Sequence, residues 1–511
     1  MRRNFVVILI LMLMMLAAAG CPENVVETDE DRPDIEPPQP VYGLKAQATS
    51  ETVALSWVSP EELDDGINKD LEDVMIVRGE NGFPNAVPVR EDKYTIGDVI
   101  GGGIVIALID PRFEEFVDIN IEAGTTYYYE AFTFDEVPNY SQATQVAATP
   151  GSQVWGRISH TQTALADGRV LLAGGLGYGG PLDRAEIFDP DTETFTAVYE
   201  EMKFERFGHT ATLLADGEVL LVGGYEAGFA QTLSKAELFD PDTQTFRRVA
   251  SETDIGRALH TATQLPDGTV LITGGTDGVN ALATLELYDP ETETFQLLPH
   301  ELWRERYGHN AAVVDQYVIV FGGFDGFTTV PYATSVRLGD FRVASLTNIN
   351  YEETPMKAGR LNATANELPD GRWLIAGGFS GALESGVEVA SAELFDFAGD
   401  PFFATTASLT QARSGHCSTD LGDGTVLIIG GIGPDDTILA GVEIYDPNDD
   451  LFVEVEPLIT PRTVAKASVL PDGRVLVTGG NQSINLFQPE PAPTAEIFDP
   501  LTSGFTVVGA E

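Results

Sequence analysis

An arginine opens each of seven related apolar stretches, and in five of them a histidine follows three residues later. A guanidinium group binds carboxylates or phosphates through a planar fork of donors. An imidazole can bind a metal ion or transfer a proton. The arginines are Arg157, Arg206, Arg257, Arg306, Arg360, Arg413 and Arg462. The histidines are His160, His209, His260, His309 and His416, with Ala363 and Ala465 in the other two stretches.

The arginines have two interpretations. In the structural one, each pairs with a glutamate that recurs later in its stretch: Glu186, Glu237, Glu286, Glu393, Glu443 or Glu496. In the functional one, all seven line an opening that binds an anionic peptide or an acidic sugar. The fourth stretch has Val336 or Arg337 in place of the glutamate. We therefore expect Arg306 and Arg360, which lie nearest to that stretch, to be the arginines least paired with protein carboxylates, and to contact a ligand.

The histidines favour packing over metal binding. Each belongs to a different stretch, so a regular fold would space them apart, whereas a metal site needs several ligands converging on one point. The short acidic segment "ELDDGINKDLED" lacks the alternating carboxylates of a calcium loop and reads as a solvated loop. We predict no metal and no other cofactor.

The seven stretches belong to a longer unit that recurs roughly every 50 residues. Each copy has a strand such as "HTATLL", an Asp-Gly pair, a strand such as "EVLLV" ending in Gly-Gly, and "AELFD" followed by Asp-Pro-x-Thr. Asp-Gly between apolar runs predicts a tight hairpin, and Asp-Pro suits a turn. Each copy is therefore predicted to be a four-stranded antiparallel meander. The Gly-Gly pairs begin at Gly174, Gly223, Gly274, Gly322, Gly377, Gly430 and Gly479.

The combination of Arg-x-x-His, Gly-Gly, Glu-x-Tyr/Phe-Asp-Pro and a final aromatic residue resembles the kelch repeat. The resemblance covers residues 153–511 and implies a β-propeller with one blade per copy, hence seven blades. The chain departs from the family in using Phe where many members have Trp, and in a degenerate fourth copy with Asp315-Gln316 in place of Asp-Gly. Some kelch propellers resemble the galactose oxidase domain, which implies a copper site with a Tyr bonded to a Cys. Cys417 is the one candidate cysteine here, and the family's Tyr-His dipeptide is absent.

Residues 41–149 alternate apolar and polar residues with the period of β-strands, which predicts a β-sandwich. The segments "VALSW", "VMIVR" and "IEAGTTYYYEAFTFDEVPNYS" resemble a bacterial fibronectin type III domain. That resemblance makes Trp57 the central core aromatic and places Tyr127 at the family's tyrosine corner. The fold class is thus all-β, with a sandwich followed by a propeller.

The N-terminal residues 1–20 resemble a bacterial lipoprotein signal peptide, with Arg2 and Arg3 before a short apolar run and small residues before Cys21. The resemblance implies that Cys21 is acylated and becomes the mature N-terminus. Residues 21–40 are acidic and rich in proline and read as an extended tether. We expect an exported protein anchored by lipid, on the periplasmic side or the cell surface of a Gram-negative outer membrane.

The net charge of −50 argues against a nucleic-acid partner, which requires basic patches. In a meander, the segments after Gly-Gly and before Arg-x-x-His lie at the same end of the strands, and these are the segments that vary most between copies. Loops on a rigid scaffold carry function disproportionately. We expect a non-enzymatic binding, adhesion or scaffold lipoprotein that recognises a protein or glycan, including an anionic one, on this face. The alternative is a carbohydrate-active enzyme.

Overall fold

The computed structural model describes residues 37–48, 53–60, 71–80, 82–90, 92–121, 125–135, 138–148, 156–177, 180–226, 228–345, 355–399, 401–484, 489–492 and 494–508. These residues form two compact units, one up to Gly156 and the other made mainly of Arg157–Gly177 and Pro181–Val508. Their regular structure is β-strand, apart from two short 3-10 helices, η3 (Gly228–Ala230) and η4 (Pro434–Asp436). No helix in these ranges is long and apolar enough to cross a membrane. The predicted signal peptide, Cys21 and most of the tether lie outside the described residues.

The N-terminal unit contains two sheets that share one hydrophobic core. The smaller sheet has the order β1 (Tyr42–Ala48), β2 (Val53–Val58), β6 (Glu115–Asp118), and the larger has the order β4 (Val99–Ile100), β5 (Gly103–Ile109), β3 (Leu71–Gly79), β7 (Tyr127–Asp135), β8 (Thr144–Ala148). Alternate residues face the core, so Leu55 and Trp57 of β2 pack with Ile76 of β3 and Tyr129 of β7. Trp57 is a core aromatic, as expected, while the likeness to fibronectin type III stays a prediction.

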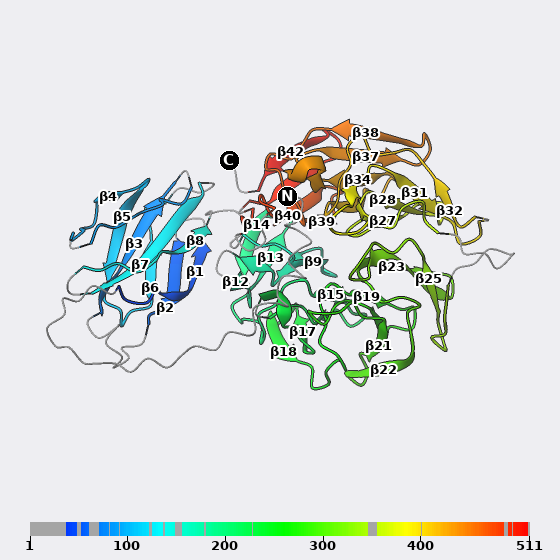
Figure 1. Ribbon diagram of the computed structural model, residues 1–511, viewed down its shortest axis with the longest axis horizontal. Helices are drawn as coiled ribbons and strands as arrows, with labels where there is room; N and C mark the ends of the chain where they lie inside the picture. The colour runs from blue at the N-terminus through cyan, green and yellow to red at the C-terminus, as the bar shows by residue number, and fades with distance from the viewer. Residues whose placement is uncertain are drawn as a thin grey trace. The chain divides into compact units, whose positions relative to one another are not determined.

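The C-terminal unit contains seven four-stranded antiparallel sheets, each built from one continuous stretch of chain (Figure 1). We number them sheets 1 to 7. Sheet 1 has β9 (Thr161–Ala164), β10 (Val170–Ala173), β13 (Ala185–Asp189) and β14 (Thr194–Ala197). Sheet 2 has β15 (Thr210–Leu213), β16 (Val219–Val222), β17 (Ala236–Asp240) and β18 (Thr245–Arg248). Sheet 3 has β19 (Thr261–Gln264), β20 (Val270–Thr273), β21 (Thr284–Asp289) and β22 (Thr294–Glu301).

The remaining sheets follow the same order of strands. Sheet 4 has β23 (Tyr307–Val314), β24 (Tyr317–Phe324), β25 (Thr334–Arg337) and β26 (Val343–Ser345). Sheet 5 has β27 (Thr364–Glu367), β28 (Trp373–Ala376), β31 (Ala392–Phe395) and β32 (Phe403–Thr405). Sheet 6 has β33 (Cys417–Asp420), β34 (Val426–Ile429), β37 (Val442–Asp446) and β38 (Leu451–Val455). Sheet 7 has β39 (Lys466–Val469), β40 (Val475–Thr478), β41 (Glu496–Asp499) and β42 (Gly504–Val507).

Short two-stranded ribbons extend three of the loops between the second and third strands. They are β11 (Leu176–Gly177) with β12 (Gly180–Pro181), β29 (Phe379–Ser380) with β30 (Val387–Glu388), and β35 (Ile432–Gly433) with β36 (Thr437–Ile438). Within each sheet the predicted turns form as expected. In sheet 2, Gly217 of the Asp-Gly turn has a φ of +92°, and the Asp240 carboxylate accepts hydrogen bonds from the N–H groups of Asp242 and Thr243.

Both faces of each sheet are buried against a neighbouring sheet. Consecutive residues of one strand therefore belong to different cores: Leu171 of β10 packs between sheets 1 and 2, whereas Leu172 packs between sheets 1 and 7. The recurrent Phe of the fourth strand packs on an aromatic ring of the third, as for Phe246 and Phe239, whose ring centres are 4.8 Å apart. A single four-stranded sheet cannot bury both of its faces and would not fold alone. Packing between two neighbouring sheets explains why each sheet is stable in this unit.

The series of sheets is closed by backbone hydrogen bonds. The second glycine of every Gly-Gly pair donates its N–H to the carbonyl of the repeated arginine in the next sheet, and the seventh bond runs from Gly480 back to Arg157 at 2.9 Å. First strands of successive sheets lie beside one another at six of the seven junctions, including β39 beside β9. Figure 1 shows the red strands of sheet 7 next to the green-blue strands of sheet 1. Sheets 1 and 7 therefore meet without exchanging a strand.

Candidate functional site

All seven repeated arginines are buried, with at most 1% of each exposed. Each guanidinium donates to the carbonyl of the first glycine of the Gly-Gly pair in its own sheet, as Arg206 does to Gly223 at 2.8 Å. In six sheets it also donates to the repeated glutamate, which is equally buried. The N–O distances are 2.7 Å for Arg206–Glu237, 2.9 Å for Arg360–Glu393 and 2.6 Å for Arg413–Glu443 and Arg462–Glu496, and the other pairs are Arg157–Glu186 and Arg257–Glu286.

The glutamates also hold the chain that leads into each arginine. The carboxylate of Glu443 accepts the N–H of Thr410, three residues before Arg413, at 2.7 Å. Glu237, Glu286, Glu393 and Glu496 accept the equivalent N–H groups of Lys203, Asp254, Lys357 and Ile459. In these five sheets the arginine and the glutamate thus join three parts of the sheet from inside. The functional interpretation of the seven arginines is wrong in this structure, because their charged groups do not reach a surface where a ligand could bind.

Sheet 4 lacks the glutamate, although not in the way the sequence suggested. Thr334, and not Val336 or Arg337, occupies the glutamate position, because it pairs with Val320 of β24 as Glu186 pairs with Leu172 of β10. Arg306 keeps the bonds to two carbonyls that the other arginines also make, here those of Gly322 and Tyr332 at 3.1 and 3.0 Å, and donates to the Thr334 hydroxyl at 3.5 Å in place of a carboxylate. Burial without a carboxylate partner lowers the pKa of Arg306 to about 10.

Arg360 differs from Arg306 and contradicts our expectation for it. It belongs to sheet 5, where its guanidinium donates to Glu393 and to the hydroxyl and carbonyl of Ser391, all within 2.9 Å. The missing glutamate of sheet 4 therefore affects Arg306 alone.

The five repeated histidines connect neighbouring sheets. The Nε2 atom of each lies at hydrogen-bond distance from a threonine hydroxyl of the preceding sheet: His209 from Thr161 (3.1 Å), His260 from Thr210 (2.9 Å), His309 from Thr261 (3.0 Å), His416 from Thr364 (3.1 Å) and His160 from Thr478 (2.9 Å). Burial lowers the pKa of all five, to about 3 for His309 and His416, so their rings are neutral. Their role is packing, as the sequence indicated.

The described residues contain no group of three or more His, Cys, Asp or Glu side chains that could hold a metal ion. Cys417 packs in the core between sheets 6 and 7, with Leu427 and Val477 in the same cluster. Burial raises the pKa of its thiol to about 11, so it is protonated at neutral pH.

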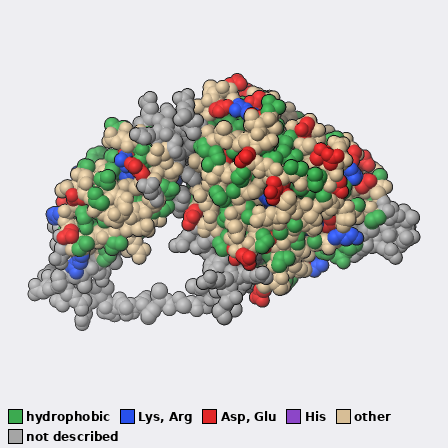
Figure 2. Space-filling model, turned by 90° about the horizontal axis from the view of Figure 1, so that it is seen from above, with side chains coloured by type: hydrophobic (Ala, Val, Ile, Leu, Met, Phe, Trp, Pro, Cys, Tyr) green, Lys and Arg blue, Asp and Glu red, His purple; other side chains and the backbone are tan. Residues whose placement is uncertain are grey.

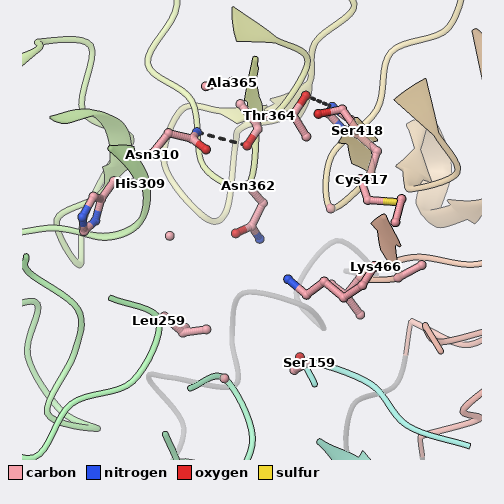
Figure 3. A pocket seen from close by; sticks show the side chains of 18 of the residues that line it. Ser159, Leu259, His309, Asn310, Asn362, Thr364, Ala365, Cys417, Ser418 and Lys466 are labelled. Carbon is pink, nitrogen blue, oxygen red and sulfur yellow. Dashed lines mark hydrogen bonds between the residues drawn. The ribbon is translucent and has the colours of Figure 1, made fainter. Parts of the chain in front are cut away.

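The C-terminal unit has a central cavity of about 460 Å³. It is lined by the residues at the start of all seven first strands, from Ser159 and His160 in sheet 1 to Val464–Ala467 in sheet 7. A second cavity lies deeper along the same strands and shares Lys466 with the first. In Figure 3, Lys466 extends into the central cavity with its nitrogen facing the Asn362 side chain. No Asp or Glu is among the described residues that line either cavity.

A chain of backbone hydrogen bonds surrounds this cavity. It joins the residues two positions after each arginine: Ser159, Gly208, Leu259, Gly308, Asn362, Gly415 and Val464. Each of the last six donates its N–H to the carbonyl of the one before it, at 2.7 to 3.3 Å. All seven have a positive φ, which is strained for Leu259 and Val464 because their side chains are bulky. The opening is therefore held by the backbone and by conformations that favour glycine or asparagine.

The sequence interpretation missed Lys466 and Asn362. A comparison of the repeated units nonetheless distinguishes both residues. Four residues after the arginine, sheets 1, 2, 3 and 5 have threonine, whereas sheet 7 has Lys466. Two residues after the arginine, Asn362 is the single asparagine. Both are departures at positions that the repeat otherwise fills with small or neutral residues.

The loops between second and third strands and the connections between sheets lie at the same end of the strands as the central cavity. We refer to this end as the loop face. Several large apolar side chains are exposed on it, including Trp303 and Phe327, which are 70% and 81% exposed, and Val279. Figure 2 shows that acidic side chains are spread over much of the visible surface, in agreement with the net charge of −50.

Residues 159–378 match the family model of the KLHDC2/KLHL20/DRC7 Kelch-repeats domain. This span holds sheets 1 to 4 and the first two strands of sheet 5. The kelch repeats that this match identifies lie within these residues. An F-box/kelch-repeat protein of Arabidopsis thaliana is 22% identical over 281 residues, which are 48% of this chain and 56% of that protein. The chain thus spans little more than half of this curated relative.

Among solved structures, that of YjhT covers 60% of this chain and 99% of its own, with 14% identity and a TM-score of 0.46. The kelch repeats and the closed series of four-stranded sheets together make the C-terminal unit a β-propeller. Loops on a rigid scaffold carry function disproportionately, so the loop face and its cavity are the candidate site.

Proposed function

We propose that the protein is an exported, lipid-anchored binding protein whose seven-bladed kelch propeller recognises a protein or glycan on the loop face. One observation carries the proposal: the central cavity and the exposed side chains of Trp303 and Phe327 lie at the same end of the sheets. Exposed aromatic side chains on the same face as a cavity are typical of binding surfaces, because they are costly to leave in water. The count of seven blades is supported by the seven sheets and the seven shared cores that connect them.

The anchoring part of the proposal rests on the sequence before residue 41. Replacement of Cys21 by serine would remove the acylated sulfur. We expect the variant to leave the membrane fraction or to accumulate as an unprocessed precursor, which fractionation and N-terminal mass analysis would distinguish. A mature wild-type protein that begins at residue 20, or membrane association that is unchanged in the variant, would contradict this proposal.

The recognition part is tested by cross-linking on intact cells that express the tagged full-length protein. Trp303→Ala and Phe327→Ala together should abolish the cross-linked partner or the glycan-array signal seen with wild type. Leu501→Ala is the matched control, since Leu501 is 96% exposed but lies in the Asp-Pro-x-Thr turn at the opposite end of sheet 7. Equal loss in both variants, or no loss in either, would mean that the loop face is not the recognition surface.

A further inference from the structure

Lys466 lacks the packing role that the equivalent residue has in other sheets. In sheets 1, 2, 3 and 5 the residue at this position is a threonine that bonds to the histidine of the next sheet. In sheet 7 the position is Lys466, and the next histidine, His160, bonds to Thr478 of β40 instead. The junction between sheets 7 and 1 is therefore complete without Lys466, whose side chain extends into the cavity (Figure 3).

The Lys466 ammonium is an uncompensated charge. It forms no ion pair and no hydrogen bond with any residue that the structure describes, although acidic residues outnumber basic ones by 79 to 29 in the chain. Its side chain is open to solvent in the cavity, yet protein surrounds it, and this desolvation lowers the pKa of Lys466. The nearby groups are His160, His209 and Cys417, which are neutral at pH 7 for the reasons given above. Lys466 therefore places a positive charge without a counter-ion in the cavity, which an anionic ligand could pair with.

The rest of the wall is polar and neutral. Asn362 is exposed to the cavity, and its amide has no hydrogen-bond partner among the described residues. Asn310 donates to the carbonyl of Ala363 at 3.1 Å, which fixes its side chain and leaves its oxygen as an acceptor. Ser418 donates to Asn366 at 2.5 Å, which leaves the Asn366 amide nitrogen as a donor. Fixed amide and hydroxyl groups of this kind suit the hydroxyl groups of a sugar.

The size of the cavity selects a small ligand. About 460 Å³ lies within the range of small-molecule sites, and the backbone hydrogen bonds around the opening limit its expansion. A peptide carboxylate alone would pair with Lys466 but would leave the amides of the opposite wall without partners. A ring that carries several hydroxyls and one carboxylate would use both.

We propose that the central cavity binds a sugar acid of the uronic type, free or as the terminal residue of a glycan, with Lys466 paired to its carboxylate and Asn362 bonded to its hydroxyl groups. This inference rests on the proposed function, because it names the ligand class of the loop face. Neither residue is among the arginines that the sequence indicated.

The test is isothermal titration of the purified full-length protein with D-glucuronate and with D-glucose, which differ by the carboxylate. We expect glucuronate to bind at least tenfold more tightly than glucose. Lys466→Met should abolish that preference, Lys466→Arg should retain it, and Asn362→Ala should weaken glucuronate binding. Lys203→Met is the matched control, since Lys203 lies outside the cavity and pairs with Glu200.

Thermal unfolding separates a lost site from a lost fold. Lys466→Met should melt no lower than wild type, because Lys466 is exposed and forms no ion pair or hydrogen bond with the described residues that the variant would lose. If it does unfold, Lys466→Arg and Asn362→Ala still decide the question. Failure of glucuronate to bind, equal binding of glucose, or unchanged binding by Lys466→Met would overturn the inference. An acidic peptide that binds as tightly as glucuronate would overturn the sugar class. None of these results would contradict the proposed function as long as the Trp303 and Phe327 variants still lose their binding partner.

Discussion

The guanidinium of Arg206 donates to a carboxylate oxygen of Glu237 at 2.7 Å, and neither side chain is exposed to solvent. The same guanidinium donates to Gly223 at the end of β16, and the same carboxylate accepts the N–H of Lys203. One ion pair therefore connects the second strand, the third strand and the incoming chain of sheet 2. Because the arrangement is found in five sheets, it is a structural unit of the repeat.

Removal of one partner of this pair should be costly. Arg206→Met leaves Glu237 buried without its cation, and we expect the free energy of unfolding to fall by about 3–5 kcal/mol. The measurement is urea denaturation of the full-length protein. Arg247→Met is the control, because Arg247 and Glu218 form a pair on the surface, whose loss should cost about 1 kcal/mol or less. An Arg206→Met variant as stable as the control would show that the buried pairs are dispensable.

The missing carboxylate of sheet 4 can be restored. Thr334→Glu places a carboxylate where the other six sheets have one, within reach of Arg306 and of the N–H of Trp303, which is three residues before it. We expect a gain of about 1–3 kcal/mol, the value of hydrogen bonds to charged groups. The same change in an Arg306→Met background should destabilise the protein, since the new charge is then unpaired. A lower melting temperature for the Thr334→Glu single variant would contradict this interpretation.

The architecture of the repeats was predictable because its signals are local. Asp-Gly, Gly-Gly and Asp-Pro are each dictated by a turn or a close approach, so the sequence alone predicts four strands per copy and their order. The carboxylate partner of six arginines was predictable too, because a guanidinium pairs well with a carboxylate and one glutamate recurs at a fixed distance. The failure at Thr334 has a physical cause: without the glutamate, the sequence contains nothing that fixes the register of β25.

The burial of the arginines and the position of Lys466 were harder to predict. Whether a side chain at the start of a first strand points into a sheet junction or into the central cavity depends on the packing of two sheets whose residues are distant in sequence. Arg206 and Lys466 are both basic and lie near the same turn of the repeat, yet one is enclosed and the other lines a cavity. The useful signal was the departure from threonine at Lys466, which only a comparison of all copies reveals.

Acid should destabilise the propeller through its histidines. Burial lowers the pKa of His309 to about 3, whereas an unfolded histidine titrates near 6.5. Between these values the unfolded chain binds more protons, so stability falls as pH falls, by about 1.4 kcal/mol per pH unit for each such histidine.

His309→Asn removes one of these groups. Its stability should fall less steeply than that of wild type between pH 6.5 and pH 3, as measured by urea unfolding at several pH values. His300→Asn changes an exposed residue of β22 and should follow the wild-type slope. Parallel curves for wild type and His309→Asn would show that His309 does not remain neutral in the folded protein.

The Gly-Gly pairs should tolerate no side chain. Gly223 has a φ of +63°, and a Cβ there would lie 2.3 Å from the carbonyl oxygen of Arg257. Gly217 has a φ of +92° with nothing within 4 Å of its Cβ position. Gly217→Ala should therefore cost about 1–2 kcal/mol in backbone strain alone, whereas Gly223→Ala should cost about 3 kcal/mol or more. Equal losses in thermal unfolding would mean that the close approach to Arg257 can relax.

The hydrogen bond from Gly480 to Arg157 has a consequence for how the protein is made. Six of the seven sheet junctions are crossed by the chain itself, but sheets 7 and 1 are held together by non-covalent contacts, which include their shared core, backbone bonds of this kind, the His160–Thr478 bond and the Arg474–Glu193 ion pair. During synthesis, sheet 1 emerges first and keeps one apolar flank uncovered until the last sheet arrives more than 300 residues later. A nascent chain therefore exposes an apolar sheet face, which can aggregate, during almost all of its synthesis. A chain that is truncated before sheet 7 forms an open arc with an exposed apolar face at each end, and does not close into a smaller ring.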